Sequence, residues 1–435
     1  MKSASPAHKA ALAPRIAAPE IATQLQAICP HAIQIVNELR AHGHDAYIVG
    51  GCIRDLLIGR QAKDFDVATD AHPHEVKALF PRSRIVGRRF QIVHVRFGRE
   101  MIEVTTFRAS HDTETAQPRH SKQTESGMLL RDNVYGDIVQ DADRRDFTVN
   151  ALYFDPADAS IIDYVDGMTD LKQKTLRTIG EPLRRYQEDP VRMLRAARFA
   201  AKLKFSLHPD THAPLLEHGH LLLQIAPARM FDEVLKLFLG GYALASLEAL
   251  QKFQLFQFLF PATGECLQRQ HDFAASLLEH TMRNTDARIA IGKPVTPAFL
   301  FAALLWPAVS HEAKRLRSEG LPDHEALQQA AQISLTRQVE HTTIPKRFSI
   351  PMREIWELQA RLHHNHGKRA KSLRANPRFR AAYDFILLRE QSGEELDGLG
   401  QWWTEYQEQN PVDETTTRSS SSRRKPRRRR RRPDG

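Results

Sequence analysis

Positions 46–66 join a strand-prone run, a pair of glycines, a short amphipathic segment and two carboxylates one residue apart. Glycine adopts backbone torsions that other residues avoid, so Gly50 and Gly51 predict a tight strand-to-helix turn whose N–H groups can approach an anion. Alternate residues of a strand share a face, so we expect Asp64 and Asp66 to point to the same side. The fold must therefore bring an anion-accepting turn and two acids to one place.

This combination predicts a site for a triphosphate and a metal ion. Arg54, one turn into the expected helix, can add a charged fork to a phosphate. Two carboxylates on one face repel each other unless a cation lies between them, and Mg²⁺ is the oxygen-seeking ion that also binds phosphates. Each motif alone is common and usually a plain turn or a solvated strand end, but their order and spacing are specific. The sequence has no Gly-x-x-x-x-Gly-Lys-Ser/Thr loop, which excludes the P-loop route to nucleotide binding.

The excess positive charge is concentrated at the C-terminus. The chain of 435 residues has a formal net charge of +10, and ten of its 62 basic residues lie at positions 418–435 beside one of its 52 acids. Such a segment cannot bury apolar surface, so we predict that residues 411–435 form a disordered tail. The tail favours polyanions, with RNA, DNA and anionic membrane surfaces all open, and a merely solubilising terminus is the plain alternative.

The cysteines favour a reducing compartment, and the hydropathy pattern gives no sign of a membrane span. Cys29, Cys52 and Cys266 are odd in number and widely spaced, which indicates neither a disulfide framework nor a zinc site. No apolar run approaches the roughly 18 residues that a membrane span needs. We predict a cytoplasmic protein whose residues 1–30 form a disordered leader.

Two further acids lie near the expected aspartate pair. Residues 91–107 predict a hairpin, and Glu103 on its second arm reaches the aspartate pair if the hairpin pairs beside that strand. An ordinary exposed glutamate is the equal alternative. Asp146 lies beside an apolar stretch and needs a partner, so it is either an ion pair with Arg144 or Arg145, or a ligand for metal or a ribose hydroxyl.

Beyond about residue 185 the periodicity is helical. Glu188, Arg192 and Arg195 are spaced to share one helix face, which suits contact with the edge of a base, although a solvated ion-pair face is commoner. A later basic cluster with an aromatic residue nearby is a candidate RNA track, with a solvated helix face as the default. Its residues are Lys368, Arg369, Lys371 and Arg374.

Four ordered motifs resemble the class II nucleotidyltransferases of the polymerase β superfamily, the family of bacterial poly(A) polymerases and CCA-adding enzymes. The motifs are Gly50-Gly51-Cys52-Ile53-Arg54-Asp55, Asp64-Phe65-Asp66, Arg144-Arg145-Asp146-Phe147-Thr148-Val149-Asn150 and Glu188-Asp189-Pro190-Val191-Arg192. Residues 85–95 and the basic tail resemble the poly(A) polymerase branch. Arg88 and Arg89 within that segment are further RNA-binding candidates.

The resemblance implies roles for the matching residues. Asp64 and Asp66 would hold two Mg²⁺ ions, with Glu103 or Asp146 as a further catalytic carboxylate. Asp189 and Arg192 would pair with the adenine edge in place of a template base. The remaining residues implied to bind the nucleotide are Gly50, Gly51, Arg54, Arg145, Asn150 and Arg195.

The resemblance also implies a fold and an activity. The fold class would be α+β, with a small mixed-sheet catalytic head over 31–165, a helical neck carrying the base-reading helix over 166–260 and a helical RNA-binding body over 261–410. The activity would be template-independent polyadenylation, in which AMP passes from ATP to the 3′-hydroxyl of an RNA and pyrophosphate is released. The product would promote RNA decay, with RNA-decay proteins as partners. A CCA-adding enzyme and a non-catalytic RNA-binding protein are the alternatives.

Overall fold

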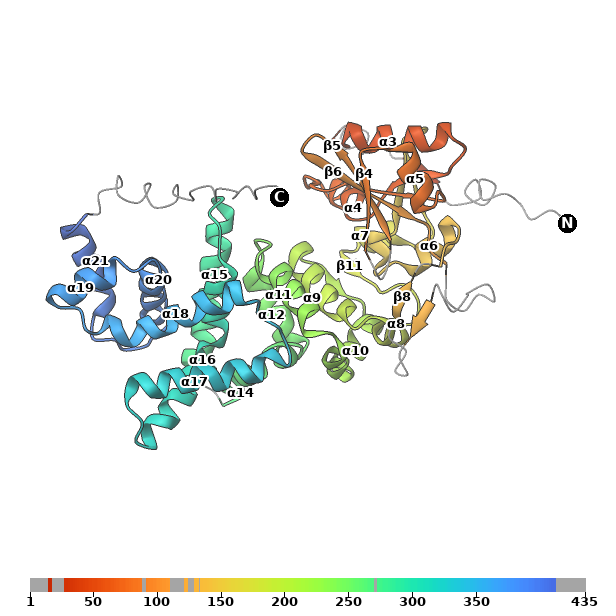
Figure 1. The fold of residues 1–435 in the computed structure, drawn as a ribbon. Helices are drawn as coiled ribbons and strands as arrows, with labels where there is room; N and C mark the ends of the chain where they lie inside the picture. The colour runs from red at the N-terminus through yellow and green to blue at the C-terminus, as the bar shows by residue number, and fades with distance from the viewer. Residues whose placement is uncertain are drawn as a thin grey trace, which may run out of the picture.

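The computed structural model describes residues 15–17, 27–87, 91–109, 121–123, 129–132, 134–269 and 272–411. Nearly all its strands lie before residue 177, and the rest of the described chain is almost wholly helical. Figure 1 shows the sheet at one end of the molecule and the last helices at the other. This arrangement confirms the predicted α+β class, a mixed-sheet head followed by a helical body.

Eight strands of the described residues form one sheet, in the order β1-β10-β9-β2-β3-β6-β5-β4. Strands β3 and β6 are parallel, and every other neighbouring pair is antiparallel. The strands are β1 (Arg15–Ala17), β2 (Ala46–Val49), β3 (Asp66–Thr69), β4 (Ser83–Val86), β5 (Ile92–Phe97), β6 (Glu100–Thr106), β9 (Leu152–Asp155) and β10 (Ser160–Asp163). Two short pairs lie outside it: β7 (Ser121–Gln123) with β8 (Leu129–Asp132), and β11 (Thr175–Leu176) with β12 (Ser206–Leu207). The expected hairpin is β5–β6.

Part of the leader belongs to this sheet. Residues 15–17 pair with β10 at the sheet edge, so the expectation of a disordered leader over 1–30 is wrong there. Arg15 Nη1 lies 3.2 Å from Asp155 Oδ2, and Arg40 Nη1 lies 2.7 Å from Asp155 Oδ1. The edge strand is therefore fixed both by ladder hydrogen bonds and by a shared carboxylate. Helix α3 (Pro30–Ala41) begins at the last residue of the predicted leader.

Alternating side chains of β2 divide the core of the head between two faces. Ala46 and Ile48 belong to the same apolar core as the buried side of α3, together with α5 (Pro73–Leu79). Tyr47 and Val49 lie in a second core with residues of α6 (Ile138–Arg144). Helices on both faces thus hold β2 and β3 rigidly. The ends of these strands carry the glycine turn and the aspartates.

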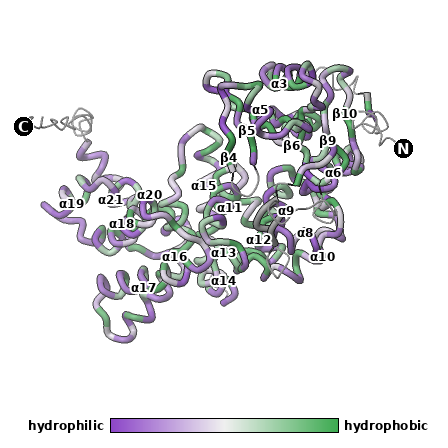
Figure 2. Tube along the Cα trace, turned by 45° about the vertical axis from the view of Figure 1, so that its right-hand side comes forward, coloured by the Kyte–Doolittle hydropathy of each residue, from purple (hydrophilic) through white to green (hydrophobic). Residues whose placement is uncertain are grey.

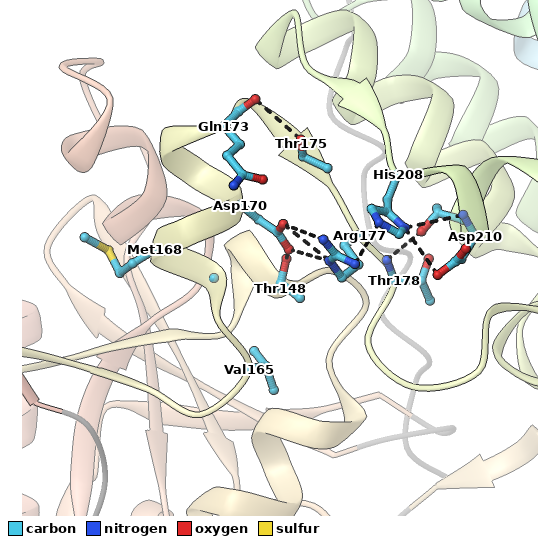
Figure 3. A network of polar contacts seen from close by, with 12 residues as sticks. Thr148, Val165, Met168, Asp170, Gln173, Thr175, Arg177, Thr178, His208 and Asp210 are labelled. Atoms are coloured by element: carbon cyan, nitrogen blue, oxygen red, sulfur yellow. Dashed lines mark hydrogen bonds and ion pairs between the residues drawn. The ribbon is translucent and has the colours of Figure 1, made fainter.

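A polar network fastens the head to the neck (Figure 3). Thr148 Oγ1 donates to Asp170 Oδ2 at 2.7 Å, and Arg177 Nε donates to the same oxygen at 3.0 Å. Arg177 Nη1 lies 2.9 Å from His208 Nε2 in the neck. Gly167 lies so close to the Thr148 carbonyl oxygen that a Cβ there would overlap it. The head and neck therefore meet in a defined geometry.

The remaining helices succeed one another through the head, neck and body. They are α4 (Gly51–Leu57), η1 (Thr148–Asn150), α7 (Gly167–Lys172), α8 (Pro182–Glu188), α9 (Val191–Leu203), α10 (Pro209–Glu217), η2 (Gly219–Gln224), α11 (Pro227–Phe238), α12 (Ala243–Lys252), α13 (Phe256–Leu259), α14 (Pro261–Gln268), α15 (Asp272–Ala290), α16 (Pro297–Ser318), α17 (Asp323–Val339), α18 (Lys346–Leu362), α19 (Gly367–Arg374), α20 (Phe379–Gln391) and α21 (Leu399–Gln409).

Hydrophobic and hydrophilic positions alternate along the body helices, as Figure 2 shows. In the described parts of the chain, no helix combines the length and the apolar character that crossing a membrane requires. The predicted tail, apart from residue 411, lies outside the described residues. The predicted domain boundaries stay predictions.

Candidate active site

Three carboxylates lie around the start of β3. Asp66 begins β3, and Glu103 is its register partner on the parallel neighbour β6. Asp64 lies directly before the strand and is exposed, whereas Phe65 between the two aspartates is buried. Burial, followed by the charge of Glu103, raises the pKa of Asp66 to about 6, with Arg145 opposing the rise and Asp64 adding to it. Both neighbouring acids therefore disfavour the ionised form of Asp66.

The glycine turn lies against the same carboxylate. Gly50 has φ +90° and ψ −140°, a conformation that side chains other than glycine's rarely adopt. A Cβ at Gly50 would lie 3.9 Å from Asp66 Oδ2 and 3.7 Å from Arg145 Nη1. The turn thus leaves a small space, bounded by one acid and one cation, just before α4 begins.

A buried network holds Arg145 beside this turn. Its Nη2 and Nε donate to Asp141 Oδ2 at 2.9 and 3.0 Å, and Nε also donates to the Tyr153 hydroxyl at 3.0 Å. Tyr153 donates to the same Asp141 oxygen at 2.7 Å. Burial alone would raise the pKa of Asp141, but Arg145 and the neighbouring donors hold it below its ordinary value. Sequence reasoning missed Asp141 and Tyr153, although the i, i+4 spacing of Asp141 and Arg145 was a usable signal.

Arg54 is buried beneath the turn. Its Nε and Nη2 donate to Asp55 Oδ1 at 2.8 and 2.6 Å, Nη1 donates to Asn150, and the guanidinium lies 5.0 Å from the centre of the Phe199 ring. A Cβ at Gly51 would lie 3.3 Å from Arg54 Nη2. Asp55 and Asn150 accept from three of the five N–H groups of Arg54, so the expected contact of Arg54 with a phosphate stays a prediction.

Asp146 pairs with a residue of the neck. Arg195 donates to its Oδ2 from Nε and Nη2 at 2.7 and 2.5 Å, and Asn150 Nδ2 donates to Oδ1 at 3.0 Å. Burial alone would raise the pKa of Asp146, but Arg195 and Asn150 hold it well below its ordinary value. The expected ion pair with Arg144 or Arg145 is wrong, because Arg144 donates to a backbone carbonyl and Arg145 to Asp141. The carboxylate opposite Asp66 is thus that of Glu103.

The expected base-reading residues lie where two neck helices meet. Helix α8 ends at Glu188 and α9 begins three residues later, so Glu188 and Arg192 do not share one helix face. They still interact, because Arg192 Nη1 donates to Glu188 Oε2 at 3.3 Å and to the Arg185 carbonyl oxygen at 2.7 Å. Asp189 Oδ2 accepts from Arg229 Nη2 at 2.9 Å. Sequence reasoning missed Arg229, since α11 is far from α8 in the chain and no local pattern links them.

The RNA-binding candidates fall in two places. Arg88 and Arg89 lie outside the described residues. Arg374 donates to the Asn410 carbonyl oxygen and is partly buried. The other three basic residues on α19 are exposed: Lys368, Arg369 and Lys371.

The carboxylate cluster fits a hard divalent cation. Asp64, Asp66 and Glu103 offer only oxygen donors, and burial, followed by the charge of Glu103, raises the pKa of Asp66 although Arg145 opposes the rise. The oxygens are more widely spread than the ligand atoms of a separate group, Cys29, His31 and Glu100, which lie within 4.8 Å of one another. Mg²⁺ keeps several waters and binds through one or two carboxylates, so it does not need all three acids as direct ligands.

Comparison with protein families assigns three segments of the chain. The poly A polymerase head domain matches residues 46–177, a probable RNA- and SrmB-binding site of polymerase A matches residues 204–267, and the polymerase A arginine-rich C-terminus matches residues 319–434. Poly(A) polymerase I of Escherichia coli O6:H1 is 44% identical over 391 residues, which are 89% of this chain and 84% of that protein. The chain belongs to the poly(A) polymerase I family.

Other relatives place the chain within this family rather than among CCA-adding enzymes. Poly(A) polymerase I of Haemophilus influenzae is 45% identical over 87% of this chain and 85% of that protein. The CCA-adding enzyme of Geobacillus stearothermophilus is 38% identical over 54% of this chain and 55% of that enzyme. As a member of the poly(A) polymerase I family the chain is a polynucleotide adenylyltransferase, and CCA-adding enzymes are more distant relatives. The prediction of the enzyme class is thereby confirmed.

Solved structures of CCA-adding enzymes share the fold. The Bacillus stearothermophilus enzyme in complex with CTP has a TM-score of 0.58 and 26% identity, over 88% of this chain and 82% of that chain. The Thermotoga maritima enzyme complexed with tRNA has a TM-score of 0.58 and 18% identity, over 90% and 85%. The head-domain match includes all four proposed catalytic acids: Asp64, Asp66, Glu103 and Asp146. Asp189 and Arg192 lie between the head match and the RNA-binding match.

Proposed function

We propose that the chain adds AMP from ATP to RNA 3′ ends without a template and releases pyrophosphate. The observation that carries the proposal is the register of Asp66 with Glu103, which sets two acids beside the Gly50 turn and Arg145. A cation and a triphosphate fit together at such a place, because the acids hold the cation while the turn and the guanidinium face the phosphates. Membership of the poly(A) polymerase I family supports adenylate as the unit that is transferred.

Asp64, Asp66 and Glu103 are the proposed holders of two Mg²⁺ ions. When bound, Mg²⁺ would supply activation of the RNA 3′-hydroxyl and neutralisation of charge on the triphosphate. Arg145 is fixed through its Nη2 and Nε, which leaves Nη1 directed at the space beside Gly50. We assign this Nη1 to a phosphate oxygen of ATP.

Asp146 is proposed as a positioning residue. Both its oxygens accept hydrogen bonds, one from Arg195 of α9 and one from Asn150, so the carboxylate ties the head to the neck. Asn150 also accepts from Arg54 beneath the glycine turn. We therefore propose that Arg54, Asn150 and Arg195 act on the nucleotide through the position of the turn and of α9.

Asp189 and Arg192 are the proposed readers of adenine. A carboxylate accepts from the amino group of adenine and an arginine donates to a ring nitrogen, so together they test both kinds of group without a template. Arg229 and Glu188 fix these two side chains by ion pairs at 2.9 and 3.3 Å. The pairs favour a single arrangement, which suits addition of one kind of nucleotide.

RNA contacts are proposed for the exposed basic residues of α19, for Arg88 and Arg89, and for the tail. Backbone contacts by such residues give affinity with little sequence preference. RNA-decay proteins are proposed as partners, and the tail has enough charge to touch anionic membranes. The three cysteines are free, which fits the proposed cytoplasmic location.

One assay separates adenylate addition from CCA addition. The purified protein is given Mg²⁺ and either ATP or CTP, with an unstructured RNA and separately with a tRNA that lacks its 3′ end. We expect long ladders from ATP alone on both RNAs. Addition of two C residues and one A to the tRNA, followed by arrest, would contradict the proposal.

A further inference from the structure

The body contains a cavity of about 780 Å³ that the proposed reaction does not use. Helices α15, α16, α18 and α20 line it, and Figure 1 places these helices away from the sheet of the head. Its volume lies within the range typical of small-molecule sites. We call it the body cavity.

The floor of the body cavity is apolar and its rim is basic. Apolar side chains from three helices form the floor, among them Phe299, Phe348, Ile355 and Leu388. The rim carries four arginines: Arg288, Arg347, Arg378 and Arg380. An apolar interior below a ring of guanidiniums suits a ligand that combines a flat apolar part with negative charge.

Two of the rim arginines, Arg288 and Arg347, form no ion pair among the described residues, although Arg288 interacts with Asp384 at longer range. Arg378 pairs with Glu354 at 2.6 Å, and Arg380 pairs with Asp384 at 3.0 Å. Arg288 donates to a backbone carbonyl, whereas the Arg347 guanidinium lies 4.8 Å from the centre of the Phe348 ring. The rim therefore has surplus positive charge for an anion.

The same cavity offers a flat surface and hydrogen-bonding groups. The Arg347 guanidinium lies over the Phe348 ring on one wall, and half-buried Phe299 of α16 offers the cavity an aromatic ring, the kind of side chain on which unpaired bases stack. On the opposite helices Asn284 Nδ2 donates to Gln391 Oε1 at 3.2 Å, so both amides line the cavity. Half-buried Asp384 adds an acceptor.

We propose that the body cavity binds an unstacked base of the RNA substrate, with Arg288 and Arg347 on the flanking phosphates. An acidic peptide would satisfy the arginines but leave the apolar floor unfilled, so the floor favours a base. The inference rests on the proposed function, since that function supplies a single-stranded RNA. The base enters far from the adenylate being added, so the cavity acts on RNA affinity and not on the transfer step.

Filling the cavity tests this directly. Ala287 is exposed on α15 and lines the cavity, whereas Ala290 is exposed on the same helix and does not. We expect Ala287→Trp to weaken binding of an oligoadenylate about tenfold, the scale of stacking one base on an aromatic side chain. Binding of an abasic strand of equal length should be unchanged, and Ala290→Trp should change neither.

Removing the rim charges gives the complementary result. The double variant Arg288→Ala, Arg347→Ala should weaken binding of both strands. The slope of the logarithm of the binding constant against the logarithm of the salt concentration should become shallower by about 1.4, because each phosphate contact on a single strand contributes about 0.7. Arg283→Ala is the matched control on α15, because Arg283 already pairs with Glu279. Its salt dependence should equal that of the unaltered protein.

Several outcomes would overturn the proposal. With Ala287→Trp, an equal loss of affinity for the oligoadenylate and the abasic strand would do so, as would no loss of affinity for either strand. Polyglutamate serves as a third probe, and a loss of affinity confined to it would assign the cavity to an acidic peptide. AMP addition to a short primer, measured separately, keeps the two claims apart. An unaltered protein that binds oligoadenylate through the cavity but adds no AMP would refute the proposed function alone. Normal AMP addition without base-dependent binding at the cavity would refute this inference alone.

Discussion

The surroundings of Asp66 disfavour its ionised form, as expected of a metal ligand when no cation is bound. Its pKa is raised from 3.8 to about 6 by burial and by Glu103, with Asp64 adding to the effect. Between these two pH values the folded protein binds a proton that the unfolded chain has released. The contribution of Asp66 to the stability of the metal-free protein therefore falls as the pH rises through this window, and it is lowest above pH 6.

The first prediction concerns Asp66→Asn. The substitution removes the buried charge, so the metal-free variant at pH 7.5 should be more stable than the unaltered protein by about 2 kcal/mol. Mg²⁺ should raise the melting temperature of the unaltered protein above pH 6 and less so below, because protons compete for the same oxygens. Calorimetry with and without Mg²⁺ checks both. A variant that still responds to Mg²⁺ would refute the assignment of Asp66 as a ligand.

The second prediction separates the two acids that stood as alternatives for the third carboxylate. Glu103→Gln should raise the Mg²⁺ concentration for half-maximal activity and leave stability nearly unchanged, since this side chain is 43% exposed. Asp146→Asn should instead lower the free energy of unfolding by about 2 kcal/mol, because it breaks the pair with Arg195. Activity titrated with Mg²⁺ and urea unfolding measure the two effects. The reverse pattern would make Asp146 the metal ligand.

Residue-scale prediction from the sequence worked where the pattern was local. The hairpin carrying Glu103 was predicted, with an ordinary exposed glutamate as the equal alternative, and the structure pairs Glu103 with Asp66. The partner of Asp146 was not predictable, because Arg195 comes from a helix 49 residues away across the junction of head and neck. Likewise, the hydrogen bond from Arg54 to Asn150 joins residues 96 positions apart, and no local pattern links them.

At the scale of one element, the strand–turn–helix unit owes its shape to Gly50. The third prediction is that Gly50→Ala lowers stability by about 1–2 kcal/mol and also raises the KM for ATP, because a methyl group there strains the backbone and fills the space beside Arg145. Gly59 gives a matched control: it ends the same helix region with φ +72° and has open space around it. Gly59→Ala should cost stability without changing the KM. Equal KM values for the two variants would contradict a phosphate at the turn.

Sequence periodicity did not predict the boundary between α8 and α9. The spacing of Glu188, Arg192 and Arg195 predicted one shared face, but Pro190 separates two helices, and the first of these residues belongs to α8. The side chains of Glu188 and Arg192 meet nevertheless, because Arg192 Nη1 donates to Glu188 Oε2 across the break. Leader residues 15–17 were missed for a related reason, because a three-residue edge strand carries almost no pattern of its own.

At the scale of the whole molecule, the surplus basic charge and the proposed catalytic residues lie in different parts of the chain. The head and neck contain the proposed catalytic and base-reading residues, while much of the surplus basic charge lies in the tail. This separation predicts that RNA affinity and the transfer step can be altered independently.

The fourth prediction follows from that division. Deleting residues 418–435 should weaken RNA binding and flatten its dependence on salt, by about 0.7 for each phosphate of a single strand that the tail neutralises. The rate of AMP addition at saturating RNA should stay the same, because the tail contributes no residue to the acid cluster. Replacing arginines 427–432 by glutamine is the control for tail length and should reproduce most of the effect. An unchanged salt dependence would count against the tail as an RNA-binding segment.

The central claim is that template-independent AMP addition occurs at the acids beside the glycine turn. Asp64→Ala tests it most directly, because this exposed side chain can be removed without disturbing the core. Glu38→Ala, at an exposed position on α3, is the control. We predict that Asp64→Ala reduces incorporation of labelled AMP into an RNA primer to background while RNA binding persists, and that Glu38→Ala changes neither. Incorporation by Asp64→Ala at the level of the control would contradict the account.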